Sequence, residues 1–223
     1  MISSIFISKN RKDVFQLNSY CEINNYNLSA HSMISFSSLP FEFDFIFDVV
    51  YFSSPRAVDF YLKKMPVTSI IGKKIACSGL RTSDRIKSNG INVDFVLKNP
   101  GNVSDSTAVF QDWLGDKKVL FPCSTISLKT VLTGLPKGQF KIVEVYETLN
   151  KSRLIDLHDI YVFTSPSNVE SFLLKNKINK SSIIISWGDS TSNYLKNKGH
   201  ESDYILVNSS IIELITLLEK INV

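Results

Sequence analysis

An internal duplication is the feature of this sequence that most constrains its fold. Residues 52–62 (FSSPRAVDFYL) and 163–173 (FTSPSNVESFL) are identical at five of eleven positions and begin 111 positions apart. A second matching pair, residues 75–96 and 184–205, follows in the same order at an offset of 109 positions. That period is far too long for a solenoid repeat. The 223-residue chain is therefore predicted to form two similar lobes, each long enough to bury its own core.

Short apolar and β-branched runs alternate with polar segments of helical length in both halves of the chain. The runs expected to be strands are residues 4–8, 49–52, 74–77, 93–96, 119–122, 142–146, 161–163, 183–186 and 204–207. Strands separated by helix-sized intervals predict an α/β fold with parallel sheets.

One strand in each copy runs directly into Ser-Pro, as Ser54-Pro55 in the first copy and Ser165-Pro166 in the second. A serine hydroxyl caps a helix by accepting a backbone N–H bond, and proline lacks the N–H that the first turn leaves without a partner. Each motif therefore predicts a helix that begins at the carboxyl end of a strand.

The second repeated block predicts a related design, in which a strand is followed by a glycine turn, a hydroxyl cap and a helix closed by Gly90 or Gly199. Its glycine and hydroxyl residues are Gly79, Thr82, Gly188, Ser190 and Thr191. Open α/β sheets bind ligands at the carboxyl ends of their strands, and helix N-termini attract anions. Each loop by itself is explained as a helix start. Their repetition in two lobes favours a receptor for carboxylates or phosphates.

The two copies are not placed symmetrically in the chain. The first begins some forty residues after the N-terminus, whereas the second runs almost to the C-terminus. We therefore expect residues 1–31 to fold with residues 150–223 as one discontinuous lobe, and residues 35–146 to form the other. The crossings near residues 32–38 and 145–150 read as extended segments. They are predicted to pair as a two-stranded linker.

Composition excludes several classes of protein. A net charge of +4 suits an anionic ligand, but no dense basic stripe indicates nucleic-acid binding, and no apolar run reaches membrane-spanning length. Cys21, Cys77 and Cys123 form no CxxC pair, and the three histidines are scattered, so a metal site is not expected. The N-terminal apolar residues lack a small-residue cleavage site and read as a strand, which predicts a cytoplasmic protein. We expect it to be a monomer.

An ordered set of motifs resembles the uroporphyrinogen-III synthase family. The motifs are Phe52-Ser53-Ser54-Pro55-x-Ala57-Val58, Leu120-Phe121-Pro122-Cys123-Ser124, Val145-Tyr146-Glu147-Thr148, Phe163-Thr164-Ser165-Pro166-Ser167-x-Val169, and Gly188-Asp189-Ser190-Thr191 followed by Lys198-Gly199. The resemblance covers nearly the whole chain. It implies two α/β lobes, one interrupted by the other, with a two-stranded linker and an active site in the cleft between them.

The resemblance also implies an activity. Such an enzyme closes the linear tetrapyrrole hydroxymethylbilane into uroporphyrinogen III, with loss of water and inversion of ring D, and needs no cofactor. The resemblance makes Tyr146 the candidate proton donor, although a tyrosine at the end of an apolar strand also serves the core or a hinge. The eight substrate carboxylates call for helix N-termini, hydroxyls and some basic residues. The candidate binding residues are Ser8, Lys9, Ser53, Ser54, Arg56, Gly79, Thr82, Ser124, Thr164, Ser165, Ser167, Gly188, Ser190 and Thr191, with Arg81 as a further cation.

Two other functions fit parts of the pattern. A two-lobed binding protein for a small anionic ligand would share the hinged architecture but is ordinarily secreted. Another anion-handling enzyme would share the helix starts but needs a carboxylate or histidine base near them, and Asp189 is the one acid in such a place. Incubation with hydroxymethylbilane followed by isomer analysis separates all three.

Overall fold

The computed structural model describes residues 2–97 and 103–221, and the side chains of these residues except at 103–106. The chain divides into two compact units. Unit 1 contains residues 1–35 and 149–223, and unit 2 contains residues 36–148. The ranges expected from the sequence, 1–31 with 150–223 and 35–146, end within a few residues of these limits.

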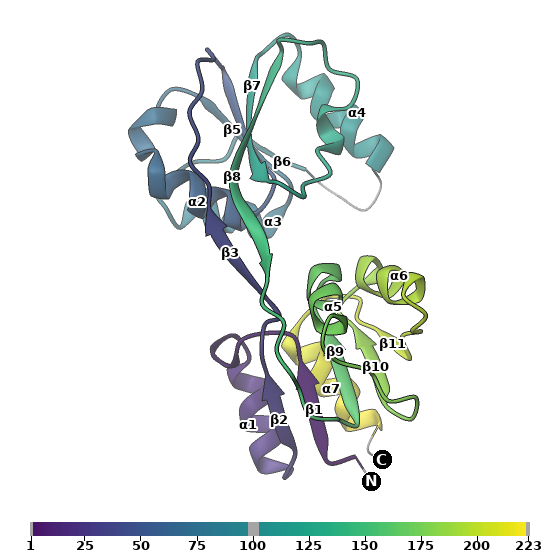
Figure 1. The fold of residues 1–223 in the computed structure, drawn as a ribbon. Coiled ribbons are helices and arrows are strands. Elements are labelled where there is room, and N and C mark those ends of the chain that lie inside the picture. The colour runs from purple at the N-terminus through teal and green to yellow at the C-terminus, as the bar shows by residue number, and fades with distance from the viewer. Residues whose placement is uncertain (1, 98–102, 222–223) are drawn as a thin grey trace. The chain divides into compact units, whose positions relative to one another are not determined.

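Unit 1 is built on a five-stranded sheet with the strand order β11-β10-β9-β1-β2, in which neighbouring strands pair in parallel (Figure 1). Its strands are β1 (Ser4–Ile7), β2 (Asn27–Ala30), β9 (Ile160–Phe163), β10 (Ile183–Ser186) and β11 (Tyr204–Ile205). Its helices are α1 (Phe15–Ile23), α5 (Pro166–Leu173), α6 (Asp189–Asn197) and α7 (Ile211–Ile221), with a 3-10 turn at Arg11–Asp13. Ile5 and Phe6 pair with β9, so the N-terminal strand belongs to the sheet of the second repeat.

Unit 2 is built on a six-stranded sheet with the order β3-β8-β7-β4-β5-β6. Its strands are β3 (Ile34–Ser38), β4 (Val49–Phe52), β5 (Lys74–Cys77), β6 (Phe95–Val96), β7 (Val119–Ser124) and β8 (Phe140–Asn150). Its helices are α2 (Pro55–Lys64), α3 (Leu80–Lys87) and α4 (Val103–Leu114), with 3-10 turns at Val67–Ile70 and Thr130–Leu132. From β8 through β7, β4 and β5 to β6, neighbouring strands pair in parallel. The α/β class with parallel sheets is therefore confirmed.

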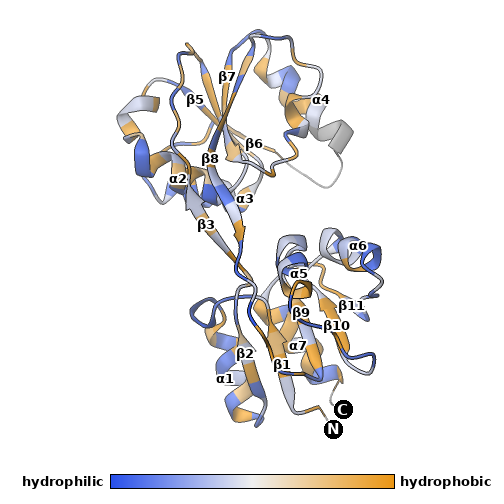
Figure 2. Ribbon diagram, viewed as in Figure 1, coloured by the Kyte–Doolittle hydropathy of each residue, from blue (hydrophilic) through white to orange (hydrophobic). Residues whose placement is uncertain are grey.

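Each sheet is covered by helices on both faces, which is why its central strands, such as β4 and β9, are apolar and buried along their whole length (Figure 2). In unit 1, α1 and α7 pack on the face that carries Ile5 and Ile7, and α5 and α6 pack on the face that carries Phe6. In unit 2, α2 and α3 pack on the face of Val50 and Phe52, and α4 packs on the opposite face.

The two sheets are related by a permutation of the chain. The order β6-β5-β4-β7-β8 in unit 2 corresponds to β11-β10-β9-β1-β2 in unit 1. In unit 2, the last two strands of this order, β7 and β8, come after the repeated motifs in the sequence. In unit 1 the corresponding strands, β1 and β2, come from the beginning of the chain. The asymmetry of the duplication thus has a structural reason, since each copy has its full set of strands.

The crossing segments are adjacent strands. β3 and β8 are hydrogen-bonded neighbours in the sheet order, and the Leu39 N–H donates to the Val145 carbonyl at 3.1 Å. The Lys151 N–H donates to the Met33 carbonyl at 2.7 Å. The expected pairing of these two extended segments is therefore present.

Several element predictions need correction. The strand β2 was not predicted, because the sequence Asn27–Ala30 has a single large apolar residue and little β-propensity. The strand expected at residues 142–146 extends over Phe140–Asn150, and those expected at 93–96 and 204–207 shorten to two residues each. None of the helices within residues 2–97 and 103–221 has the length and apolar character that crossing a membrane requires.

Candidate functional site

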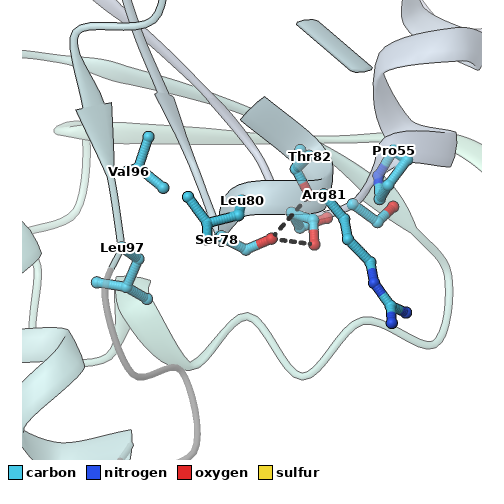
Figure 3. A pocket seen from close by; sticks show the side chains of 10 residues that line it. Pro55, Ser78, Leu80, Arg81, Thr82, Val96 and Leu97 are labelled. Atoms are coloured by element: carbon cyan, nitrogen blue, oxygen red, sulfur yellow. Dashed lines mark hydrogen bonds between the residues drawn. The ribbon is translucent and has the colours of Figure 1, made fainter. Parts of the chain in front are cut away.

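A cavity of about 770 Å³ lies at the carboxyl ends of β4, β5 and β6 in unit 2 (Figure 3). It is lined by Ser53, Ser54, Pro55, Ser78, Gly79, Leu80, Arg81, Thr82, Val96 and Leu97. The cavity therefore brings together the first Ser-Pro loop and the first glycine loop, two repeated motifs that are more than twenty residues apart in the sequence. This is the edge at which parallel sheets bind ligands.

The Ser-Pro loop has the predicted capping geometry in both units. Ser54 is the N-cap of α2 and its hydroxyl accepts the Ala57 N–H at 3.1 Å. Ser165 is the N-cap of α5 and its hydroxyl accepts the Asn168 N–H at 3.3 Å. Both helices carry proline at the first turn, as the sequence indicated.

The glycine loop begins its helix in a different way from the prediction. Gly79 and Gly188 are themselves the N-caps of α3 and α6, and neither helix has a side-chain cap bond. The expected hydroxyl cap is wrong because Thr82 lies inside the first turn, buried, with its hydroxyl 3.2 Å from the Ser78 hydroxyl. A helix start without a side-chain cap has room to receive an anion.

Ser78 joins the two loops of the cavity. Its hydroxyl donates to the Ser53 carbonyl at 2.9 Å and lies next to the Thr82 hydroxyl, as the dashed lines in Figure 3 show. Leu80 and Arg81 are exposed at the first turn of α3. The wall of the cavity thus consists of hydroxyls, the N-termini of α2 and α3 and one guanidinium beside apolar side chains.

A smaller cavity of about 210 Å³ adjoins the first and shares Ser53, Ser78 and Leu97 with it. It adds the loop after β7, through Ser127, Leu128, Lys129, Thr130 and Val131, together with Tyr51 and Phe121. The Lys129 ammonium pairs with the Glu144 carboxylate at 3.0 Å. Ser124, a predicted binding residue, ends β7 and is buried, with its carbonyl accepting the Ser127 N–H at 3.1 Å.

Tyr146 lies in β8 with only 6% of its surface exposed. Its hydroxyl is 3.4 Å from the Ser54 hydroxyl, which belongs to the cavity wall. Its ring stacks on the Phe60 ring, with the ring centres 5.0 Å apart, and meets the Phe36 ring edge-on, with the ring centres 5.9 Å apart. The Arg56 guanidinium lies 3.7 Å from the centre of the Phe36 ring. Tyr146 and Arg56 therefore gather around the Ser-Pro helix start, but neither lines the cavity itself.

In unit 1, the side chains of Ser8 and Thr164 are joined to each other. The Thr164 N–H donates to the Ser8 hydroxyl at 2.8 Å, and the Thr164 hydroxyl donates to the Ser8 carbonyl at 2.8 Å. Ser8 is 1% exposed. These bonds tie the carboxyl ends of β1 and β9 together, so both hydroxyls have a structural role in this unit.

The other predicted residues of unit 1 lie at the starts of α5 and α6. Ser167 is half-buried in the first turn of α5, and Ser190 is exposed in the first turn of α6. Thr191 is buried, and the Lys9 ammonium lies 5.1 Å from the Trp187 ring centre. The first residue of α6 is Asp189, an acid at the position that Leu80 holds in unit 2. The two glycine loops are thus similar in backbone but different in charge.

The cysteines are poor candidates for nucleophilic catalysis. Burial raises the pKa of the Cys123 thiol to about 11 and also raises that of Cys77, which precedes the glycine loop. Thiols of raised pKa carry little thiolate at neutral pH.

Sequence reasoning missed several residues of the cavity walls: Leu80, Val96, Leu97, Ser127, Lys129 and Thr130. Leu80 lies inside a motif whose sequence signal comes from its glycine and hydroxyl residues. Lys129 is a single cation in a loop, and its backbone φ of 57° gives no sequence signal because the residue is not glycine.

A family model described as uroporphyrinogen-III synthase HemD matches residues 28–215. The fold is similar to that of uroporphyrinogen-III synthetase from Helicobacter pylori, with a TM-score of 0.72 and 20% identity over 99% of this chain and 100% of that chain. A mutant uroporphyrinogen III synthase from Thermus thermophilus gives a TM-score of 0.65 and 11% identity over 98% of this chain and 97% of that chain. No match was found among the curated proteins.

Proposed function

Because the chain belongs to the uroporphyrinogen-III synthase family, we propose that it converts hydroxymethylbilane to uroporphyrinogen III at the 770 Å³ cavity of unit 2 and the loops around it. The family consists of cyclising lyases of haem biosynthesis, and this chain shares that activity. A non-catalytic binding protein is not favoured.

The observation that carries the placement is the convergence of two helix starts on one cavity. The Ser54 and Gly79 loops, at the starts of α2 and α3, both line it. Positive helix ends and hydroxyls suit the carboxylates of the substrate, and the apolar side chains of Leu80, Val96 and Leu97 suit its pyrrole rings. Arg81 adds a cation at the same wall.

The first chemical step is loss of the hydroxyl group from ring A as water. We assign the proton to Tyr146, delivered through Ser54. The Ser54 oxygen accepts the Ala57 N–H and lies 3.4 Å from the Tyr146 hydroxyl, and it retains one hydrogen that it can donate to the departing oxygen. The C–O bond breaks with its electron pair on that oxygen, and the pyrrole nitrogen stabilises the cation that remains. The cation then bonds to the substituted carbon of ring D, and the bond from that carbon to the bridge toward ring C breaks and re-forms at the free carbon of the same ring, which inverts it. That carbon loses its proton, which balances the proton that Tyr146 gave up through Ser54.

Most of the catalytic effect is expected to come from positioning. The substrate cyclises unaided to the wrong isomer, so the protein must hold ring A and ring D in the geometry that leads to inversion. We propose that the unit 1 loops with Ser167 and Ser190 contribute to substrate binding, and that Ser8, Thr164 and Thr191 shape those loops. We also propose that the protein acts as a monomer in the cytoplasm.

A matched pair of substitutions at Leu80 tests the site. Leu80 is 76% exposed at the first turn of α3, where an acid also suits the helix dipole, so folding is preserved. In Leu80→Asp the new carboxylate faces the carboxylates of the substrate. Repulsion of about 1–3 kcal/mol should raise KM by about 5- to 150-fold relative to Leu80→Asn. Equal KM values for the two variants would place the substrate elsewhere.

A further inference from the structure

The position of the Tyr146 hydroxyl is weakly fixed by hydrogen bonding. Among the residues that the structure describes, its hydrogen-bond partner is Ser54, at 3.4 Å. That distance is well beyond the usual 2.7–2.8 Å of an O–H···O bond, so this contact constrains the phenol little.

Packing of the ring constrains it much more. The Phe60 ring stacks on the Tyr146 ring with an interplanar angle of 17° and a distance of 5.0 Å between ring centres. The Phe36 ring meets the Tyr146 ring edge-on, with an interplanar angle of 73° and 5.9 Å between ring centres. Offset stacking and edge-to-face contact are the two favourable geometries for aromatic pairs. Phe60 comes from α2, the helix that Ser54 caps, and Phe36 comes from β3, the strand beside β8.

The Phe36 ring is in turn covered by a cation. The Arg56 guanidinium, 3.7 Å from the ring centre, lies in the first turn of α2. Arg56, Phe36, Tyr146 and Phe60 thus form a continuous cluster between α2 and the pair of strands β3 and β8. We refer to these four residues as the aromatic cluster.

We propose that Phe36 and Phe60 are positioning residues that hold the Tyr146 hydroxyl beside Ser54 at the cavity. The inference rests on the proposed function of Tyr146 as the proton donor. Neither phenylalanine lines the cavity, so each acts through Tyr146. Phe60 fixes the ring relative to the helix start, and Phe36 fixes it from the side of β3.

The test uses Phe36→Leu and Phe60→Leu, with Phe43→Leu as the matched control. Phe43 packs half-buried against the same core but pairs with Phe47 and not with Tyr146. We expect each of the first two variants to lower kcat for uroporphyrinogen III formation at least about fivefold below the control, with KM changed less than kcat. Phe36→Tyr, which keeps the ring, should restore most of the rate.

A double-mutant cycle separates positioning from general packing. In a Tyr146→Phe background, Phe36→Leu and Phe60→Leu should lower kcat no further, because the hydroxyl that they position is gone. Additive losses in that background would overturn the inference. So would rates equal to that of Phe43→Leu.

The aromatic NMR signal of Tyr146, assigned by its disappearance in Tyr146→Phe, provides a readout independent of turnover. It should shift in Phe36→Leu and Phe60→Leu and stay in place in Phe43→Leu. A shifted signal with an unchanged rate would refute the positioning role while leaving the family activity intact. Failure of the unaltered protein to form the type III isomer would instead refute the proposed function.

Discussion

Removing one oxygen atom, in Tyr146→Phe, tests whether the tyrosine assists water loss or only packs. The ring and its contacts with Phe36 and Phe60 remain, so the free energy of unfolding should change by no more than about 1 kcal/mol. The initial rate of uroporphyrinogen III formation should fall by about ten- to a thousand-fold, which corresponds to about 1.4–4 kcal/mol of transition-state stabilisation. An unchanged rate and isomer ratio in a folded variant would leave Tyr146 with a structural role alone.

Asp159 should make the stability of unit 1 depend on pH. Its carboxylate accepts the N–H groups of Ser3 at 2.8 Å and Ser4 at 3.0 Å, and also both serine hydroxyls. These bonds, the Ser3 N–H foremost, hold the pKa of Asp159 below its usual value. Because the pKa is lower in the folded state, the stabilisation is complete above the unfolded pKa, about 3.9, and is lost as the pH falls through the folded pKa.

Urea unfolding of the unaltered protein and of Asp159→Asn, between pH 6 and pH 3, measures this contribution. The unaltered protein should be the more stable of the two at pH 6, and the difference should shrink below about pH 4. A difference that stays constant over the whole range would contradict the role of the charge.

At the scale of elements, the repeated aspartates of the second sequence block hold the starts of equivalent strands. The Asp94 carboxylate accepts the Ile75 N–H at 2.7 Å, and the Asp203 carboxylate accepts the Ile184 N–H at 2.7 Å. Asp94→Ala and Asp203→Ala should each lower the free energy of unfolding by about 1.5–3 kcal/mol, the contribution of a hydrogen bond to a charged group.

The matched control for these variants is Asp116→Ala, which removes an exposed carboxylate from a turn. Thermal or urea unfolding should show it to be nearly as stable as the unaltered protein. If all three variants unfold alike, the strand-start bonds have no special part in the stability of the lobes.

Helix-capping rules predicted correctly the helices whose ends are marked by a capping serine or a glycine. Ser54 and Ser165 cap helices as expected, and Gly90 and Gly199, with φ of 74° and 82°, follow the ends of α3 and α6. The strand Asn27–Ala30 has no such signal, because its place in the sheet is set by pairing with β1 and not by its own composition. Hydroxyl caps were wrongly expected in the glycine loops, where the glycine itself is the cap.

At the scale of the whole molecule, the duplication predicted two sheets of similar design but not their full correspondence. The equivalence of β7 and β8 with β1 and β2 is seen in the sheet order. It could not be predicted from the repeated motifs, because these strands lie outside them. The site could be predicted in part for the same reason. Motifs located the loops at Ser54 and Gly79, whereas the apolar wall formed by Val96 and Leu97 depends on how β6 ends beside β5.

The most direct measurement of the central claim is the isomer composition formed from hydroxymethylbilane. The substrate is generated enzymatically and incubated with the unaltered protein or with no protein. The products are oxidised at once, and the type I and type III uroporphyrins are separated. We expect type III to predominate with the protein, at a rate unchanged by a chelator, and type I to predominate without it. Type I alone above the spontaneous background, or activity lost with chelator and restored by added metal, would contradict the account.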